Sequence, residues 1–174
     1  MSEAVDTYIN EEMLAAVGTE LGRQVSFPIG ESDIRRWAVA VYYPEPPPPL
    51  FWDAEYAAGT VHGGIVAPEE FNPFAWMSAE PRGLVRAAEY DPNTLEISLG
   101  LTPPPTQFQL NGGLDVEYGV RIRPGDVITA VSSLHSYSER RGRLGLMLFT
   151  TMANVWTNQR GEQVRLTKGT VIRY

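Results

Sequence analysis

The chain has 174 residues, of which 43% are hydrophobic, and it contains no cysteine. This length and composition support one buried core and argue against intrinsic disorder, while the lack of cysteine excludes disulfides, thiolate metal sites and cysteine nucleophiles. The formal net charge of −7 at pH 7 disfavours binding to phosphate backbones, so we expect no nucleic-acid partner. The N-terminus has no signal-peptide pattern, and the longest apolar stretch, residues 144–156, is too short to cross a bilayer. We predict one soluble, cytoplasmic domain over residues 1–174.

The N-terminal part of the sequence predicts two helices and a short strand. The first helix covers residues 10–17 with Asn10 as its N-cap, and weak alternation over residues 25–29 indicates a strand. The second helix is capped by Ser32 and is predicted from apolar residues at i, i+3, i+4 and i+7 spacing: Ile34, Trp37, Ala38 and Val41. It must end before Pro44, because proline has no amide hydrogen and biases the preceding residue away from helical geometry.

A proline-rich run occupies residues 44–49, and taken alone it indicates a stiff spacer. It is followed by a turn at His62 and two glycines, and then by three apolar residues at 65–67. A further helix begins either at Pro68 or at Asn72-Pro73, since proline is favoured at the first helical position and asparagine at the cap. The sequence does not choose between these two starts.

From about residue 94 the sequence becomes rich in valine, isoleucine, threonine and aromatic residues, as is typical of strands. Turn signals such as the Arg-Pro-Gly-Asp at 123–126 separate these stretches, and short connections favour antiparallel pairing. Strands are predicted over residues 95–101, 107–118, 127–137, 144–157 and 163–174. Helices followed by a strand meander indicate an α+β domain with its sheet wrapped on a helix.

Few residues in the sequence match a known catalytic motif. The only histidines are His62 and His135, and no serine-hydrolase elbow, histidine–carboxylate metal pattern or glycine-rich phosphate loop is present. His62 is either a loop histidine or part of a place where the following glycines let the backbone approach a ligand. Glu69 and Glu70 either stabilise the start of a helix or act as a base or nucleophile beside a thioester.

Several arginines border turns, and they are either ordinary surface residues or contacts for the phosphates of coenzyme A: Arg121, Arg123, Arg140, Arg141 and Arg143.

Five segments, occurring in order, resemble the MaoC-like hydratase/dehydratase family, and most of all its fatty-acid-synthase-type N-terminal dehydratase domain. They are Ile65-Val66-Ala67-Pro68, Asn111-Gly112-Gly113, Glu117-Tyr118, Arg123-Pro124-Gly125-Asp126 and Thr157-Asn158-Gln159-Arg160-Gly161-Glu162. The resemblance covers roughly residue 20 to the end. It implies a hot-dog fold, in which an antiparallel sheet wraps around a central helix, here expected within residues 67–79. It also implies that two such domains pair to complete an acyl-CoA site.

The sequence departs from this family at the catalytic positions. Active members carry an Asp-x-Asn-Pro-x-His-x-Asp pattern, which aligns without a gap on residues 46–53 and places Pro46 at the aspartate and Phe51 at the histidine. Neither side chain titrates, and losing a positioned acid or base costs roughly 10²–10⁴-fold in rate. The family's oxyanion-binding backbone N–H falls on Pro68, which has none. The resemblance therefore predicts no catalytic residue in this chain.

The expected function is that of a substrate-shaping, non-catalytic subunit of a heteromeric enoyl-thioester hydratase or 3-hydroxyacyl-thioester dehydratase. The partner is a hot-dog subunit that retains Asp and His, or a second copy of the chain. The thioester carries coenzyme A or a carrier-protein pantetheine, and no separate cofactor or metal is expected. The residues expected to bind substrate are Phe51, His62, Gly64, Pro68, Asn111 and Gly112. Two alternatives remain: a self-sufficient thioesterase or hydratase using Glu69, Glu70 or His62, and an acyl-CoA-binding homodimer without catalysis.

Overall fold

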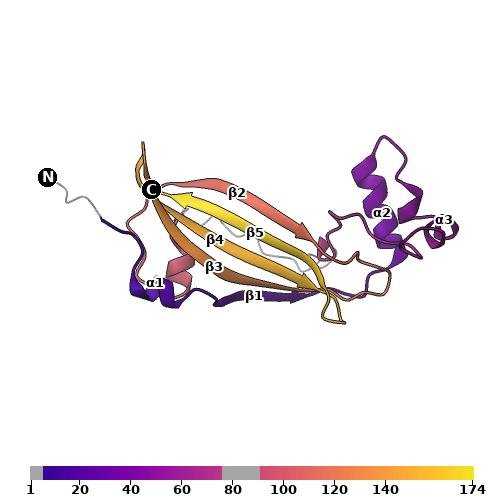
Figure 1. Ribbon diagram of the computed structural model, residues 1–174, viewed down its shortest axis with the longest axis horizontal. Helices are drawn as coiled ribbons and strands as arrows, with labels where there is room; N and C mark the ends of the chain where they lie inside the picture. The colour runs from indigo at the N-terminus through magenta and orange to yellow at the C-terminus, as the bar shows by residue number, and fades with distance from the viewer. Residues whose placement is uncertain (1–5, 76–90) are drawn as a thin grey trace, which may run out of the picture.

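The computed structural model describes residues 6–75 and 91–174, which are built around one antiparallel sheet (Figure 1). Its order is β1-β3-β4-β5-β2, with the strands at Glu20–Val25 (β1), Gln109–Tyr118 (β2), Thr129–Gly142 (β3), Gly145–Thr157 (β4) and Gln163–Arg173 (β5). Every neighbouring pair is antiparallel. The α+β class and the four predicted strands after residue 107 are confirmed. In β4, Leu146, Leu148 and Thr150 are buried, which is the period-two pattern of a strand with one covered face.

Short helices lie at the two ends of this sheet (Figure 1). They are α1 (Glu11–Ala15), α2 (Glu31–Tyr42), the 3-10 turn η1 (Pro49–Phe51), α3 (Ala54–Ala58) and α4 (Thr94–Ser98). The predicted cap of α1 is confirmed, because Asn10 Oδ1 accepts a hydrogen bond from the Met13 N–H at 2.8 Å. Helix α2 ends before Pro44 as predicted, but its N-cap is Gly30 and not Ser32. The Asp33 carboxylate accepts from the Gly30 N–H at 3.1 Å and so fixes the earlier start.

Two strand predictions are wrong. Residues 95–101 alternate in sequence, but residues 94–98 form α4, with Glu96 fully buried and Ile97 exposed. That burial is the reverse of what the strand interpretation requires, and it follows from an ion pair that holds Glu96 inside. The N-terminal strand covers residues 20–25 and not 25–29; Pro28, which has no N–H, cannot extend it.

The predicted central helix has no counterpart in the described residues up to 75. Instead, the Phe71 N–H donates to the Pro68 carbonyl oxygen in a turn, and Asn72 Oδ1 accepts from the Phe74 N–H. Pro68 therefore does not begin an α-helix. The Ala75 N–H also donates to the Asn72 carbonyl oxygen, and a helix starting at Asn72-Pro73 would continue into residues outside the described ones, so that start stays a prediction. Residues 76–79, the remainder of the predicted range, lie outside the described residues. The segment is nevertheless largely internal, since residues 65–68 and Phe71 are buried.

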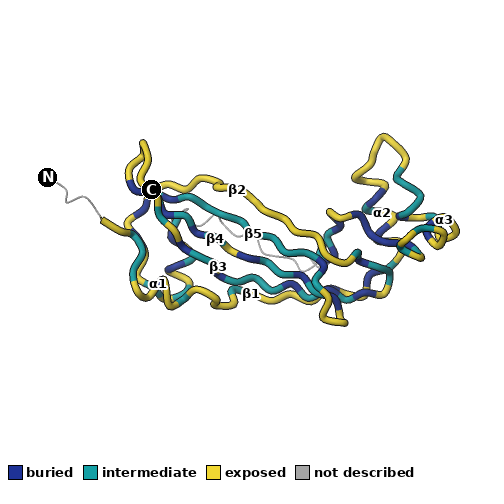
Figure 2. The backbone as a smooth tube through the Cα atoms, in the orientation of Figure 1, coloured by how far each residue is buried: buried dark blue, intermediate teal, exposed yellow. Residues whose placement is uncertain are grey.

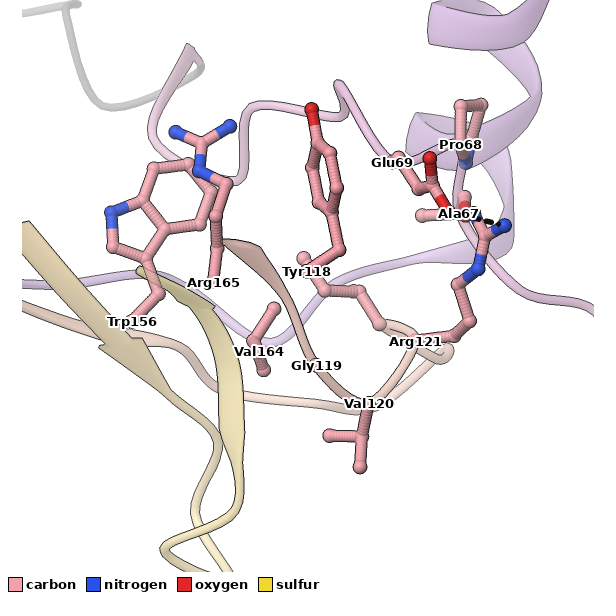
Figure 3. Close-up of a pocket in the computed structure, with 11 residues that line it drawn as sticks. Ala67, Pro68, Glu69, Tyr118, Gly119, Val120, Arg121, Trp156, Val164 and Arg165 are labelled. Carbon is pink, nitrogen blue, oxygen red and sulfur yellow. Dashed lines mark hydrogen bonds and ion pairs between the residues drawn. The ribbon is translucent and has the colours of Figure 1, made fainter. Parts of the chain in front are cut away.

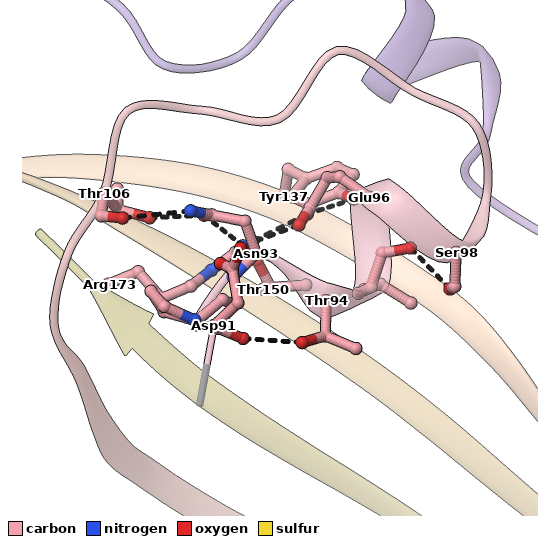
Figure 4. Close-up of polar contacts among 11 residues, drawn as sticks. Asp91, Asn93, Thr94, Glu96, Ser98, Thr106, Tyr137, Thr150 and Arg173 are labelled. Carbon is pink, nitrogen blue, oxygen red and sulfur yellow. Dashed lines mark hydrogen bonds and ion pairs between the residues drawn. The ribbon is translucent and has the colours of Figure 1, made fainter. Parts of the chain in front are cut away.

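The core has two parts, at opposite ends of the sheet (Figure 2). The larger part joins α2 and residues 65–71 to the sheet, and the smaller one lies under α1. Beside the smaller part, Arg173 and Glu96 form a buried ion pair, with Nη1–Oε2 and Nη2–Oε1 distances of 2.6 and 2.7 Å (Figure 4). The Tyr137 hydroxyl donates to Glu96, and Arg173 donates to the Thr150 hydroxyl. This network fixes α4 to strands β3, β4 and β5.

The ionisation of this network follows from its contacts. Burial alone would raise the pKa of Glu96, but hydrogen bonds from Arg173 and Tyr137, together with the Arg173 charge, hold that pKa below its ordinary value. Burial, and then the hydrogen bond to Glu96, raises the pKa of Tyr137. Glu96 is therefore charged, and Tyr137 neutral, near neutral pH.

In residues 6–75 and 91–174, no helix has the length and apolar character needed to span a membrane.

Candidate functional site

The residues aligned with the family's catalytic pair lie on a bend between α2 and α3. Phe51 ends η1 and is buried, with its ring centroid 5.9 Å from that of Tyr42. Pro46 lies earlier in the same bend and is exposed. Asp53, which the family pattern retains, caps α3 by accepting hydrogen bonds from the Glu55 and Tyr56 N–H groups at 3.0 Å each. The bend thus keeps a structural carboxylate, while an aromatic ring stands at the histidine position.

Phe51 faces an open cleft of about 510 Å³, named here the Phe51 cleft. The cleft brings together two of the predicted binding residues, Phe51 and Pro68, from segments that are separate in sequence. Its lining is Val41, Tyr42, Phe51, Pro68, Glu69, Glu70 and Arg121. Most of this wall is apolar, and its charged groups gather along the side formed by residues 69–70 and Arg121.

A second, narrow cleft, named here the Trp156 cleft, adjoins the first and shares Pro68, Glu69 and Arg121 with it (Figure 3). Its floor contains a row of paired residues across three strands, because Trp156 of β4 is opposite Arg165 of β5, and Arg165 is opposite Tyr118 of β2. The other lining residues are Ala67, Gly119, Val120, Ile122 and Val164. Together the two clefts form the candidate site.

Both carboxylates considered as bases lie at this site, and both have partners. Glu69 Oε1 pairs with Arg121 Nη2 at 2.8 Å, and Glu70 accepts a hydrogen bond from the Tyr118 hydroxyl. That hydrogen bond raises the pKa of Tyr118. Because residues 69–70 form a turn, the interpretation that they stabilise a helix start is wrong. Their geometry orders the loop above the sheet and leaves each carboxylate engaged.

The other predicted binding residues lie away from the clefts. His62 is half-buried in the turn after α3, where its N–H donates to the Thr60 hydroxyl, and Gly64 lies near Arg123. Asn111 and Gly112 are exposed on β2. A Cβ on Gly112 would lie 2.9 Å from the Ile172 side chain, which accounts for the glycine by packing. Binding roles for these four residues stay predictions.

Three cleft residues were missed by the sequence analysis: Tyr118, Trp156 and Arg165. The Arg165 Cζ atom lies 3.5 Å from the centroid of the Trp156 ring, and its Nε is buried without a hydrogen-bond partner. Burial lowers the pKa of Arg165. No sequence signal pointed to this pair, because counting from the turn at residues 158–161 would place Gln163 opposite Trp156, and a register shift between Trp156 and Thr157 brings Arg165 there instead. In the described part of the chain, no three His, Cys, Asp or Glu residues gather as a metal site.

The sequence family follows from a match over most of the chain. The model of the FAS1-like dehydratase domain region matches residues 15–167. The chain belongs to this family. Among curated proteins, no sequence match was found. The predicted resemblance to MaoC-like dehydratases is therefore confirmed at the level of family.

Solved structures of similar fold agree with this FAS1-like dehydratase assignment. The ChsH1-ChsH2 complex of Mycobacterium tuberculosis matches with a TM-score of 0.60 and 18% identity over 90% of this chain and 84% of the other. The R-hydratase PhaJ1 of Pseudomonas aeruginosa gives 0.53 and 19% over 90% and 81%. The HadBC 3R-hydroxyacyl-ACP dehydratase complex of M. tuberculosis gives 0.51 and 20% over 90% and 99%. At these identities the likeness establishes the fold, and the hot-dog prediction is confirmed.

Proposed function

We propose that this chain is the substrate-shaping, non-catalytic subunit of a heteromeric enoyl-thioester hydratase or 3-hydroxyacyl-thioester dehydratase. The observation that carries the proposal is Phe51, buried against Tyr42 and facing the Phe51 cleft at the position where the family pattern has histidine. Phenylalanine cannot exchange a proton, and the exposed Pro46 cannot replace the aspartate. Pro68, in the same cleft, has no N–H to offer an oxyanion. The cleft wall suits an acyl chain better than proton transfer.

The need for a partner is supported by an open sheet edge. All ten residues of β2 are exposed, and among the described residues the strand pairs with β5 alone, on its other side. Exposed apolar side chains project from it, including Leu110 and Leu114. Such an edge is a template for pairing with another chain. Two similar folds were solved as the two-component complexes ChsH1-ChsH2 and HadBC. A hot-dog subunit that retains Asp and His is the partner we propose.

The substrate in this proposal is a thioester of coenzyme A or of a carrier-protein pantetheine, and no separate cofactor takes part. A cytoplasmic location stays a prediction from the sequence. Glu69 and Glu70 support one rival, a self-sufficient thioesterase, because both line the Phe51 cleft. Each is engaged by a neighbouring side chain, so neither stands free as a base.

The test is reconstitution with enoyl-CoA as substrate. The chain alone should show no hydration above background, and adding it to a hot-dog subunit of the same pathway that keeps Asp and His should raise that subunit's activity. In the mixture, Phe51→Leu should change which acyl length is preferred. The ratio of kcat/KM values between two acyl lengths should change by about 10- to 200-fold at most, the value of one methylene in an apolar pocket. Phe27→Leu is the matched control, because Phe27 is exposed and lines neither cleft.

Robust turnover by the isolated chain, lost in Glu69→Gln or Glu70→Gln, would replace this proposal with the self-sufficient enzyme. Acyl-CoA binding without stimulation of any partner would favour the non-catalytic homodimer.

A further inference from the structure

Arg165 is the one cleft cation that forms no ion pair with a described carboxylate. Its guanidinium lies over the Trp156 ring, 3.5 Å from the centroid, and projects beside the Tyr118 ring (Figure 3). The aromatic contact is a cation–π interaction, which holds the cation through one face and leaves its N–H donors available. Nε is buried without an acceptor, and no ion pair joins Arg165 to any described carboxylate.

The other charged residues of the two clefts each have a side-chain partner other than Arg165. Arg121 is paired with Glu69, and Glu70 accepts from Tyr118. The charge of Glu70 opposes the lowering of the Arg165 pKa by burial, but the two side chains form no ion pair. A partly buried guanidinium normally has hydrogen-bonded acceptors, because removing a charge from water is costly unless it is compensated. The Trp156 cleft therefore contains one cation able to accept one anionic oxygen group.

We propose that Arg165 binds a carboxylate carried by the acyl group of the thioester, an inference that rests on the proposed function. A carboxylate is planar and singly charged, and it matches the fork of a guanidinium. A phosphate dianion would require a second cation, but Arg121 is held by Glu69. Apolar residues, among them Ala67 and Val164, line the same cleft and suit the methylenes that precede the carboxylate. The two clefts share Pro68, Glu69 and Arg121, so an acyl group that enters through the Phe51 cleft would carry its carboxylate toward the Trp156 cleft.

The experiment compares succinyl-CoA with butyryl-CoA, whose four-carbon acyl groups differ by a carboxylate in place of a methyl. Dissociation constants are measured by calorimetry for the chain alone and in the reconstituted complex. The wild-type chain should bind succinyl-CoA about 10- to 100-fold more tightly, as expected for hydrogen bonds to a charged group. Arg165→Met should remove that preference while keeping the wild-type affinity for butyryl-CoA.

Two further variants make the comparison specific. Arg165→Lys keeps a charge without the bidentate fork and should retain part of the preference, and it carries the test where Arg165→Met fails to fold. Arg23→Met is the control, because Arg23 is an exposed arginine that pairs with Glu20 on β1 and lines neither of the two clefts. It should leave both affinities unchanged.

The outcomes separate this inference from the function on which it rests. Binding of both thioesters with equal affinity, unaffected by Arg165→Met, would overturn the carboxylate site and leave the proposed function standing. Equal weakening of both thioesters and of free coenzyme A by Arg165→Met would overturn it in favour of a site for the phosphates of coenzyme A. No binding of either thioester, alone or with the partner, would contradict the proposed function itself.

Discussion

Arg165 and Arg173 lie near opposite ends of the same strand, β5, and they differ in burial and in hydrogen-bond partners. Arg173 is fully buried and donates to Glu96, Thr150 and Asn93, whereas Arg165 lies over Trp156 with no described anion bonded to it. The same strand therefore carries Arg173, which links α4 to the sheet, and Arg165, which forms no hydrogen bond or ion pair with a described anion. The Nε of each arginine is buried without a hydrogen-bond partner, so the difference lies in the Nη atoms. Both Nη atoms of Arg173 donate to described acceptors, which joins the fold, whereas no described acceptor binds the Nη atoms of Arg165, which leaves them for a ligand.

The difference arises from the segments that cover each end of the sheet. Over the Arg173 end, α4 inserts Glu96, whose ion-pair partner in the described part of the chain is Arg173. Over the Arg165 end, residues 65–75 cover Trp156 through the Phe74 ring at 5.2 Å and bring in two carboxylates. These carboxylates, Glu69 and Glu70, bind Arg121 and the Tyr118 hydroxyl respectively, and neither forms an ion pair with Arg165. The contrast predicts large stability effects at one end and small ones at the other.

The largest effect is expected for Arg173→Met. The substitution leaves Glu96 buried beside Tyr137 without its cation, and breaking a buried ion pair by removing one partner costs about 3–5 kcal/mol. Urea unfolding of the variant measures this loss of free energy. Arg165→Met is the matched control on the same strand, and it should lose far less because no described carboxylate depends on Arg165.

A double variant tests whether the loss comes from the unpaired charge. Arg173→Met combined with Glu96→Leu removes both charges, so it should be more stable than Arg173→Met alone. A double variant as unstable as the sum of its two single variants would show that packing, and not charge, accounts for the loss.

The same network predicts how stability depends on pH. The pKa of Glu96 is lowered in the folded state, so its contribution is present above the ordinary value of 4.5 and is lost as pH falls through the lowered pKa. The difference in free energy of unfolding between wild type and Glu96→Gln should be constant above about pH 5 and should narrow in acid. Urea midpoints across that range measure it. A difference that grows in acid would mean that the pKa of Glu96 is raised.

The sequence predicted the strands better than the covering segments, for physical reasons. β4 carries the clearest period-two burial pattern, which a sheet with one covered face requires. α4 was predicted as a strand because its apolar residues alternate as well, and only the distant Arg173 explains why Glu96 turns inward. The predicted helix start at Pro68 is a turn instead, because the Phe71 N–H donates to the Pro68 carbonyl oxygen.

The site was predicted in part for the same reasons. Phe51 and Pro68 were found through the family pattern and do meet in one cleft. Trp156 and Arg165 were missed, since their contact depends on pairing across a turn and belongs to no motif. Sequence patterns identify residues that a family shares, whereas strand register decides which unshared residues become neighbours.

A smaller loss of folding free energy is expected for a substitution at Gly119, which lines the Trp156 cleft. A Cβ there would lie 2.0 Å from the Gln163 carbonyl oxygen, which belongs to the backbone and cannot move freely. Gly119→Ala should cost about 1–3 kcal/mol, the usual penalty for overpacking, and should narrow the cleft. Gly22→Ala on β1 is the control, since an added Cβ meets nothing within 4 Å. Equal urea midpoints for the two variants would contradict the close approach at Gly119.

The smallest effect is expected for Glu69→Gln at the junction of the two clefts. The side chains of Glu69 and Arg121 are 46% and 30% exposed, and an ion pair so accessible to water contributes at most about 1 kcal/mol, less at high salt. The variant should therefore unfold within about 1 kcal/mol of wild type. In the reconstituted enzyme, turnover should fall by less than about tenfold, because loss of a true acid or base costs roughly 10²–10⁴-fold. Glu70→Gln is the matched comparison, since Glu70 bonds to a hydroxyl instead of a cation. A hundredfold fall in turnover in either variant, with folding intact, would mean that this chain supplies a catalytic acid or base and is not only a substrate-shaping subunit.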